Sequence, residues 1–273
     1  MLLTRPPRAV LRPFVKTLWA SDQTAEPFSR VAERERVIPT GMMHLVFRLS
    51  DHPLHLYDGP DDVEGKSVGL SSVGGARATS YVKDVSRPVH SVGAQLYPGA
   101  AQLLFGSPAD LLAGRHTSLR DLWGESADIV RERLRNAGSL GRELELLESI
   151  LVARLPAVRG LHPVVEYALA RFSETHQVTD VVSETGYSHR RFIELFRGAV
   201  GLSPKVFCRI MRFQRTLERL AVLPGSSWGG LALDAGYSDQ AHFNREFREL
   251  AGVSPGQYRH AAPRFPNHVP VRD

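Results

Sequence analysis

The segment from Gly236 to Tyr258 reads GYSDQAHFNREFRELAGVSPGQY, and a related segment, GYSHRRFIELFRGAVGLSPKVF, runs from Gly186 to Phe207. When the two segments are aligned on their aromatic residues, four identical pairs lie 51 positions apart: Phe192 and Phe243, Phe196 and Phe247, Gly201 and Gly252, Pro204 and Pro255. The leading Gly-Tyr-Ser is 50 apart, so the second copy has one extra residue in the turn before its helix. The chain therefore repeats one structural unit.

Each copy predicts a helix, a short turn containing glycine, and a second, capped helix. Ser188 and Asp239 are suited to be the N-caps of the second helices and are also 51 apart. The preceding helices are expected over Val178–Thr185 and Trp228–Ala235. This order is the helix-turn-helix pattern. The apolar spacing of Lys205–Leu223 predicts a long linker helix between the two units.

Helical geometry separates the residues that the copies share from those that differ. At 100° per residue, the phenylalanines four and eight positions after each cap lie on one side of the helix and are expected in the core. The opposite side carries residues that differ between the copies, apart from the pair Arg197 and Arg248: His189, Arg190, Ile193, Glu194 and Arg197 in the first, and Gln240, Ala241, Asn244, Arg245 and Arg248 in the second. Two units with one scaffold and different outward side chains are what two readers of different DNA sequences require.

The outward side chains have the chemistry of base recognition. Arg can bind guanine, Asn or Gln can bind adenine, Glu can accept from cytosine, and Ile or Ala can contact the thymine methyl group. Residues 188–219 hold eight basic residues and two acidic ones, which favours a polyanionic partner, whereas the whole chain has a net charge of only +5.

These residues closely resemble the signature of AraC/XylS-type transcriptional regulators, in which Gly-Tyr/Phe-Ser, two phenylalanines, Gly, Pro and a final Tyr-Arg recur. The resemblance covers about 161–260 and implies that one chain enters two successive major grooves of double-stranded DNA. Carried over by position, it places the base-reading residues at Arg190, Ile193, Glu194, Gln240, Ala241, Asn244 and Arg245. The expected contacts to the DNA backbone are His189, Arg197, Arg209, Arg212, Arg215 and Arg248.

A competing role is open for part of the arginine stripe on the linker helix. Arg212 or Arg215 could instead hold the two units together through a buried carboxylate, for which Glu218 and Asp234 are candidates.

The expected fold class is α+β, in which an N-terminal β-rich domain with a helical extension precedes an all-α DNA-binding domain. The predicted domains are 1–156, which is β-rich over 1–106 and helical over 107–156, then 157–260, and a flexible tail over 261–273. His44–Leu49 and Ser91–Tyr97 have the composition of strands, and Pro156–Pro163 reads as a linker.

The N-terminal part resembles, more loosely, the accessory domain of a poorly characterised subgroup of these regulators. The matching pieces include LRPFVKTLWASD, IPTGMMHLVF and SLRDLWG, although Pro39-Thr40-Gly41 stands where that subgroup usually has Pro-Asp-Gly. In the wider family such domains bind a small effector or mediate dimerisation. Five side chains of this half line a pocket or belong to an ordinary core: Trp19, Met42, Met43, Phe47 and Tyr97.

A homodimer is expected, and one helix of this half has an apolar stripe that is wide enough for partner contact as well as internal packing: Leu144, Leu147, Ile150, Leu151 and Leu155. If the protein is an activator, RNA polymerase is a further partner. No segment resembles a signal peptide or a membrane span, so a cytoplasmic protein is expected.

The main alternative is an enzyme or a cupin-like metal-binding domain fused to a DNA-binding module. His44, His52, His55 and His90 lie in the β-rich half, but they lack the His-x-His pairing typical of such sites. Cys208 is the only cysteine, and no phosphate-binding loop or nucleophile elbow is present, so the sequence predicts neither catalysis nor a cofactor. A nonspecific architectural DNA-binding protein would need denser basic charge than these mixed outward faces carry.

Overall fold

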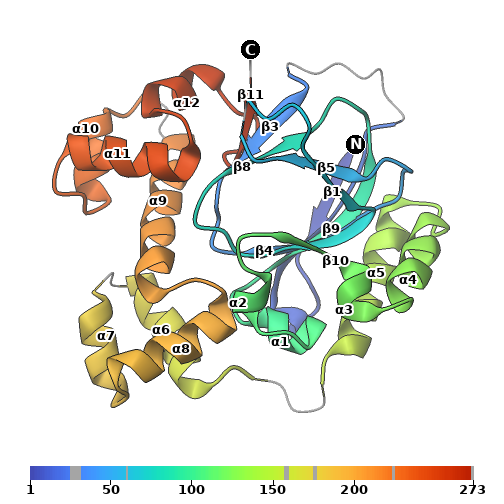
Figure 1. The fold of residues 1–273 in the computed structure, drawn as a ribbon, viewed down its shortest axis with the longest axis horizontal. Coiled ribbons are helices and arrows are strands. Elements are labelled where there is room, and N and C mark those ends of the chain that lie inside the picture. Colours follow the sequence, from blue (N-terminus) through green and yellow to red (C-terminus); the bar gives the residue numbers. More distant parts are fainter. Residues whose placement is uncertain (25–31, 60, 157–159, 175–176, 223–224, 272–273) are drawn as a thin grey trace.

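The computed structural model describes residues 1–24, 32–59, 61–156, 160–174, 177–222 and 225–271. An N-terminal part made of two β-sheets and several helices is followed by a helical part that stands beside it (Figure 1). The α+β fold class expected from the sequence is therefore confirmed.

The N-terminal strands form two antiparallel sheets. The six-stranded sheet has the order β1-β2-β9-β4-β7-β10, with these bounds: β1 Leu2–Arg5, β2 Val15–Asp22, β9 His90–Leu96, β4 Met43–Arg48, β7 Ser71–Gly74 and β10 His116–Ser118. The five-stranded sheet has the order β11-β3-β8-β5-β6, with these bounds: β11 His268–Val271, β3 Arg34–Val37, β8 Tyr81–Asp84, β5 Leu54–Tyr57 and β6 Lys66–Gly69. Figure 1 shows the five-stranded sheet above the six-stranded one.

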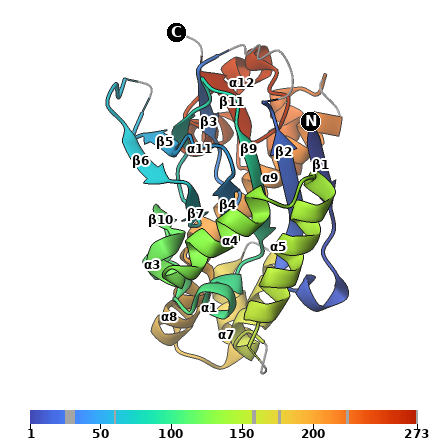
Figure 2. The same cartoon turned by 90° about the vertical axis from the view of Figure 1, so that its right-hand side faces the viewer.

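Strand β4 shows how the two faces of the six-stranded sheet differ. Because side chains alternate along a strand, Met43, Leu45 and Phe47 point to one face and are buried, whereas His44 and Arg48 point to the other and keep part of their surface exposed. The apolar face packs on the helices that follow the sheet: η1 Ala9–Leu11, α1 Ala100–Phe105, α2 Ala109–Leu112, α3 Leu119–Trp123, α4 Ser126–Arg135 and α5 Leu140–Arg154. Figure 2 shows α4 and α5 lying across the strands of this sheet.

The helical part contains the two expected units. The first consists of α6 Pro163–Glu174, α7 Val178–Thr185 and α8 His189–Val200, and the second of α10 Trp228–Asp234, α11 Gln240–Ala251 and α12 Pro255–Ala261. The linker helix α9, Pro204–Val222, connects them. The predicted inter-domain linker over Pro156–Pro163 includes residues 157–159, which lie outside the described residues.

The C-terminal tail corrects the expectation of a flexible segment. His268–Val271 forms β11 and pairs antiparallel with β3, with His268 opposite Val37 and Val271 opposite Arg34. Val269 is buried, and the tail is further held by a bond from the Tyr258 hydroxyl to the Pro266 carbonyl, at 2.8 Å. The last residues of the chain thus return to the N-terminal sheet. Residues 272–273 lie outside the described part of the chain.

Of the two uses expected for the apolar stripe of α5, the structure shows internal packing. Leu144, Leu147 and Leu151 are fully buried, and Ile150 and Leu155 are 8% exposed, because α5 packs on β2 and β9. The stripe is therefore internal core and offers no surface to a second copy of the chain.

Replacing Leu147 by Ala should lower the free energy of unfolding by about 2–5 kcal/mol, because a buried leucine leaves a cavity. The oligomeric state should not change. Thermal denaturation and sedimentation velocity of the same sample would check both parts, and Ile129→Ala on α4, which is 60% exposed, is the matched control. A variant that keeps its stability but shifts toward monomer would show that the stripe is an interface after all.

Candidate DNA-binding interface

The two capped helices α8 and α11 have the geometry that their sequences predict. The side chain of Ser188 accepts a hydrogen bond from the Arg191 N–H, and the side chain of Asp239 accepts one from the His242 N–H. Both N-cap predictions are therefore confirmed. Each helix ends at a glycine with a positive φ, +86° at Gly201 and +67° at Gly252, a conformation that glycine adopts without steric cost.

The shared phenylalanines lie in the core of their units. Phe192, Phe196, Phe243 and Phe247 are fully buried. In the first unit, Phe196 packs edge-on against Phe172 of α6 and Phe207 of α9. In the second, Phe247 packs edge-on against Phe213 of α9, with ring centroids 5.0 Å apart. The linker helix thus anchors α8 through Phe207 and α11 through Phe213.

The side chains expected to read bases lie on the solvent side of the two helices. On α8, Arg190 and Glu194 are exposed and Ile193 is half-buried; on α11, Gln240, Ala241 and Arg245 are exposed and Asn244 is half-buried. His189, Arg197 and Arg248 are exposed beside them. Arg190 is 91% exposed in its side chain and forms an ion pair with Glu194 at 3.2 Å. Such an exposed pair contributes little to stability, which leaves both groups available to a partner.

The arginines of the linker helix have protein partners. Arg209 and Arg212 both bind the buried Glu246 of α11, at 2.8 and 2.7 Å, and Arg209 also pairs with Glu249. Although burial alone would raise the pKa of Glu246, the hydrogen bonds from Arg212 and Arg209 lower it below its usual range. The Arg212 guanidinium also lies over the Tyr237 ring, 4.2 Å from its centroid.

This placement differs from the expected contacts of these arginines with the DNA backbone. Arg212 joins the linker helix to α11 through Glu246, whereas the competing role expected Glu218 or Asp234 as its carboxylate partner. Asp234 instead pairs with Arg219 at 3.0 Å. Arg215 donates to the Ser173 carbonyl at the end of α6.

A groove of about 490 Å³ lies where the linker helix meets α11 and the start of α7. Its lining residues are Val178, Lys205, Cys208, Arg209, Arg212, His242, Arg245, Glu246 and Glu249. Because Glu246 and Glu249 pair with Arg209 and Arg212, the cationic groups left at its edge are Lys205 and Arg245, both exposed. The sequence offered Lys205 only as one member of a basic stretch.

A second group of ionisable side chains lies between the two β-sheets. Glu35 binds Lys83 and the His268 ring, each at 2.9 Å, and Arg77 contacts the His116 ring at 3.1 Å. Tyr81 of the five-stranded sheet packs edge-on against His116 of the six-stranded sheet, with centroids 4.9 Å apart. We call these residues, with His44, the inter-sheet cluster.

Burial strongly shifts the ionisation of the inter-sheet cluster. It lowers the pKa of His44 to about 4 and that of His116 to about 3, and it raises the pKa of Tyr81 to about 12. The two histidines are therefore neutral at pH 7. Among the described residues, the buried Nε of Arg77 has no hydrogen-bond partner.

The four histidines considered for a metal site are dispersed. His44 belongs to the inter-sheet cluster, His90 pairs with Glu143, and the His55 ring bonds the Glu64 carbonyl. Within the described ranges, no three His, Cys, Asp or Glu side chains are grouped closely enough to hold a metal ion. In the same part of the chain, no helix is long and apolar enough to cross a bilayer.

Four of the five candidate pocket residues lie in three different surroundings. Met43 and Phe47 lie in the core that faces the helices, at 4% and 0% exposure, and Tyr97 is 37% exposed. Trp19 lies against Gly93, where an added Cβ would come within 2.6 Å of its ring.

Two capped helices that are anchored on one linker helix and expose different polar side chains define a double helix-turn-helix protein. Residues 168–261 match the family described as Helix-turn-helix domain, and residues 3–118 match the family described as Domain of unknown function (DUF6597). The chain thus carries an AraC-type helix-turn-helix domain behind a DUF6597 domain, as the resemblance predicted.

Two curated relatives match about a hundred residues of this chain. The HTH-type transcriptional regulator MtrA of Neisseria gonorrhoeae is 28% identical over 101 residues, which are 37% of this chain and 33% of that protein. The putative HTH-type transcriptional regulator YkgA of Escherichia coli (strain K12) is 30% identical over 100 residues, 37% of this chain and 41% of that protein. The matches thus span less than half the length of these relatives.

Solved structures of ToxT from Vibrio cholerae are also similar. One covers 95% of this chain and 98% of its own, with a TM-score of 0.45 and 10% identity. Another, of ToxT bound to an unsaturated fatty acid, has a TM-score of 0.44 and 10% identity and covers 94% of each chain.

Replacing Arg212 by Ala should lower the free energy of unfolding by about 1.5–3 kcal/mol, because buried Glu246 loses charged hydrogen bonds. The salt dependence of DNA binding should stay unchanged, because the guanidinium is already neutralised within the protein. Denaturation and a salt titration would check this, with Arg219→Ala, which breaks an exposed pair, as the control. A normal stability with a shallower salt dependence would assign Arg212 to a phosphate.

Proposed function

We propose that this protein is a transcriptional regulator that binds double-stranded DNA and reads two successive major grooves with α8 and α11. The observation that carries this proposal is that both helices start at capped, exposed ends, while their phenylalanines fix them to one linker helix. The base-reading residues would be Arg190, Ile193, Glu194, Gln240, Ala241, Asn244 and Arg245. Such a protein acts in the cytoplasm and performs no catalysis.

The residues that we expect to contact the DNA backbone differ in part from those expected from the sequence. Arg209, Arg212 and Arg215 maintain the junction between the units, so the phosphates are bound by His189, Arg197 and Arg248. Lys205 joins them, because it is exposed and lines the same groove as Arg245. Neutralising one phosphate contributes nearly one unit to the salt dependence of binding, so Lys205→Met should lower that slope by about 0.9.

Effector control is the second part of the proposal. The inter-sheet cluster supplies Arg77 and Lys83 beside neutral histidines and a buried guanidinium Nε without a partner among the described residues. A small molecule that carries a carboxylate or phosphate group fits this chemistry. The protein would then activate or repress transcription according to occupancy, and RNA polymerase would be its partner as an activator. A homodimer is part of the proposal, through a surface other than the α5 stripe.

Replacing Arg245 by Ala should cost about 1–3 kcal/mol of binding at one base pair of the operator and relax the base preference there. The reason is that an arginine bidentate to a base discriminates that base, whereas a phosphate contact weakens all sequences alike. A selection from random DNA followed by affinity measurements on single-base variants would check this.

Arg248→Ala, on the same helix, provides the comparison for Arg245→Ala. It should weaken all sites by a similar factor and lower the salt slope by nearly one unit. Equal losses at every operator position for Arg245→Ala would remove it from the base-reading set, and failure of the full chain to select any sequence would overturn the proposal.

Replacing Arg77 by Gln should abolish stabilisation by an acidic effector. In a thermal-shift screen of small carboxylates and phosphate esters, a ligand at 100 times its dissociation constant should stabilise the native protein by about 2.7 kcal/mol. Arg87→Gln, at an exposed position, should leave that shift intact. A ligand that stabilises Arg77→Gln as well as the native protein would place the effector site elsewhere.

A further inference from the structure

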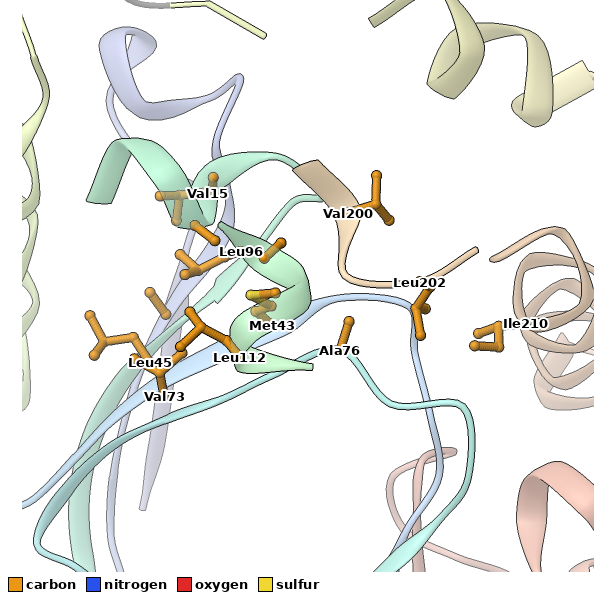
Figure 3. Packing of buried hydrophobic residues seen from close by; sticks show 14 of the residues in the cluster. Val15, Met43, Leu45, Val73, Ala76, Leu96, Leu112, Val200, Leu202 and Ile210 are labelled. Atoms are coloured by element: carbon orange, nitrogen blue, oxygen red, sulfur yellow. The ribbon is translucent and has the colours of Figure 1, made fainter. Parts of the chain in front are cut away.

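The first helix-turn-helix unit is fixed to the six-stranded sheet. Its helix α8 ends at Gly201, where an added Cβ would come within 2.9 Å of the Ala109 carbonyl oxygen in α2. Helix α2 in turn lies against the end of β7. An added Cβ at Gly75, the residue after β7, would come within 1.7 Å of the Leu112 carbonyl oxygen. Figure 3 shows Val200, the last residue of α8, and Leu202, which follows the helix, beside Ala76 and the residues of this core.

The second unit is fixed to the five-stranded sheet. Its helix α11 ends at Gly252, where an added Cβ would meet Arg36 of β3 at 2.3 Å and Ser80, next to β8, at 2.9 Å. The segment after α12 then adds β11 to the edge of the same sheet. The Ile38 N–H donates to the Asn267 carbonyl at 2.9 Å and extends this pairing.

The linker helix lies against the loop that joins the two sheets. This loop runs between β3 and β4, and an added Cβ at its Gly41, with φ +72°, would come within 3.0 Å of the Met211 Cε. The Gln214 side chain donates to the Pro39 carbonyl and to the Asn267 side chain, each at 2.8 Å. The end of α8 therefore packs toward the six-stranded sheet, α9 contacts the loop between the sheets, and the end of α11 contacts the five-stranded sheet.

The geometry points to a regulatory arrangement in which each sheet positions one recognition helix. The relative placement of the two sheets then acts, together with the linker helix that anchors both, on the distance between α8 and α11, and β11 is the element that holds the second unit to its sheet. Because double helix-turn-helix binding depends on the spacing of two half-sites about 10–10.5 bp apart, a shift between the sheets changes which spacing the protein accepts.

Through this arrangement a bound effector can change how the protein binds DNA, and this step rests on the proposed function. The inter-sheet cluster joins both sheets, and one of its members, His268, is located on β11. An acidic molecule that takes the place of the Glu35 carboxylate against both Lys83 and His268 breaks the contact of Glu35 with β11. Releasing His268 loosens β11 and frees the second unit.

The inference is tested by measuring the distance between the two units with and without β11 in place. Spin labels at Ser183→Cys on α7 and Leu233→Cys on α10 occupy exposed positions outside the expected DNA contacts. The native Cys208 does not interfere, because it is buried and burial raises the pKa of its thiol to about 12. Val269→Asp places a carboxylate at a side chain that is 2% exposed and should detach β11.

In the labelled full chain, pulsed electron paramagnetic resonance should give one narrow distance distribution, and Val269→Asp should broaden it about twofold. Ala262→Asp puts the same charge at an exposed position six residues before β11 and should leave the distribution unchanged. Gln214→Ala, which removes only the bridge to Pro39 and Asn267, should broaden it less. If Val269→Asp fails to fold, Gln214→Ala alone decides the outcome.

Binding to DNA sites whose half-site spacing varies in steps of one base pair gives a separate measurement. The full chain and Ala262→Asp should prefer one spacing, whereas Val269→Asp should accept neighbouring spacings and lose about tenfold in affinity at the preferred one. An unchanged distance distribution in both Val269→Asp and Gln214→Ala overturns the inference. A broadened distribution in a protein that binds no DNA sustains the inference and overturns the proposed function instead.

Discussion

The buried carboxylate of Glu246 is the contact on which the geometry of the DNA-binding part depends. Removing a carboxylate from water costs several kcal/mol unless charged hydrogen bonds replace the lost solvation. Arg209 and Arg212 supply those bonds from two successive turns of the linker helix, and the Tyr237 ring covers the Arg212 guanidinium. Because both arginines must reach one carboxylate, α11 cannot rotate about its axis without breaking the cluster. The exposed face that carries Asn244 and Arg245 is fixed by the same constraint.

The first unit is held differently. At the position that corresponds to Glu246, α8 carries Leu195, and α8 is joined to α6 and α9 by the aromatic contacts of Phe172, Phe196 and Phe207. Apolar packing of this kind tolerates small rotations better than a bidentate ion cluster, whose hydrogen bonds are directional. The repeated sequence therefore encodes one scaffold with two different junctions.

The features that could be predicted from the sequence are those set by neighbours along the chain. Ser188 and Asp239 cap their helices because their side chains reach N–H groups three residues away, and the phenylalanines share a face because their spacing fixes it. Residues that contact each other in the structure but lie far apart in the sequence leave no such local pattern. Glu246 meets arginines 34 and 37 residues earlier, and β11 pairs with a strand more than 230 residues earlier. The tail also contains Pro270, which is tolerated because β11 is an edge strand.

The inter-sheet cluster shows why side-chain chemistry alone did not locate a candidate pocket. The large apolar residues Met43 and Phe47 suggested one, but alternation along β4 turns them toward the helices and turns His44 toward the other sheet. A stripe of leucines carries a similar ambiguity. The spacing of the leucines in α5 is the same whether the stripe faces its own sheet or a partner protein. The contacts of α5 with β2 and β9 show that it faces its own sheet.

The glycines that end the two recognition helices link the repeat to the N-terminal part. Each adopts a left-handed backbone as a cap, and each also admits a close neighbour that a side chain would displace. The neighbours differ in stiffness. Gly201 faces the backbone carbonyl of Ala109, which cannot move without α2, whereas Gly252 faces the end of the Arg36 side chain, which can adopt other rotamers. The first unit is thus rigidly joined to the N-terminal part, whereas the second depends on β11 for its place on the five-stranded sheet, so movement of a unit away from its sheet should originate at the second.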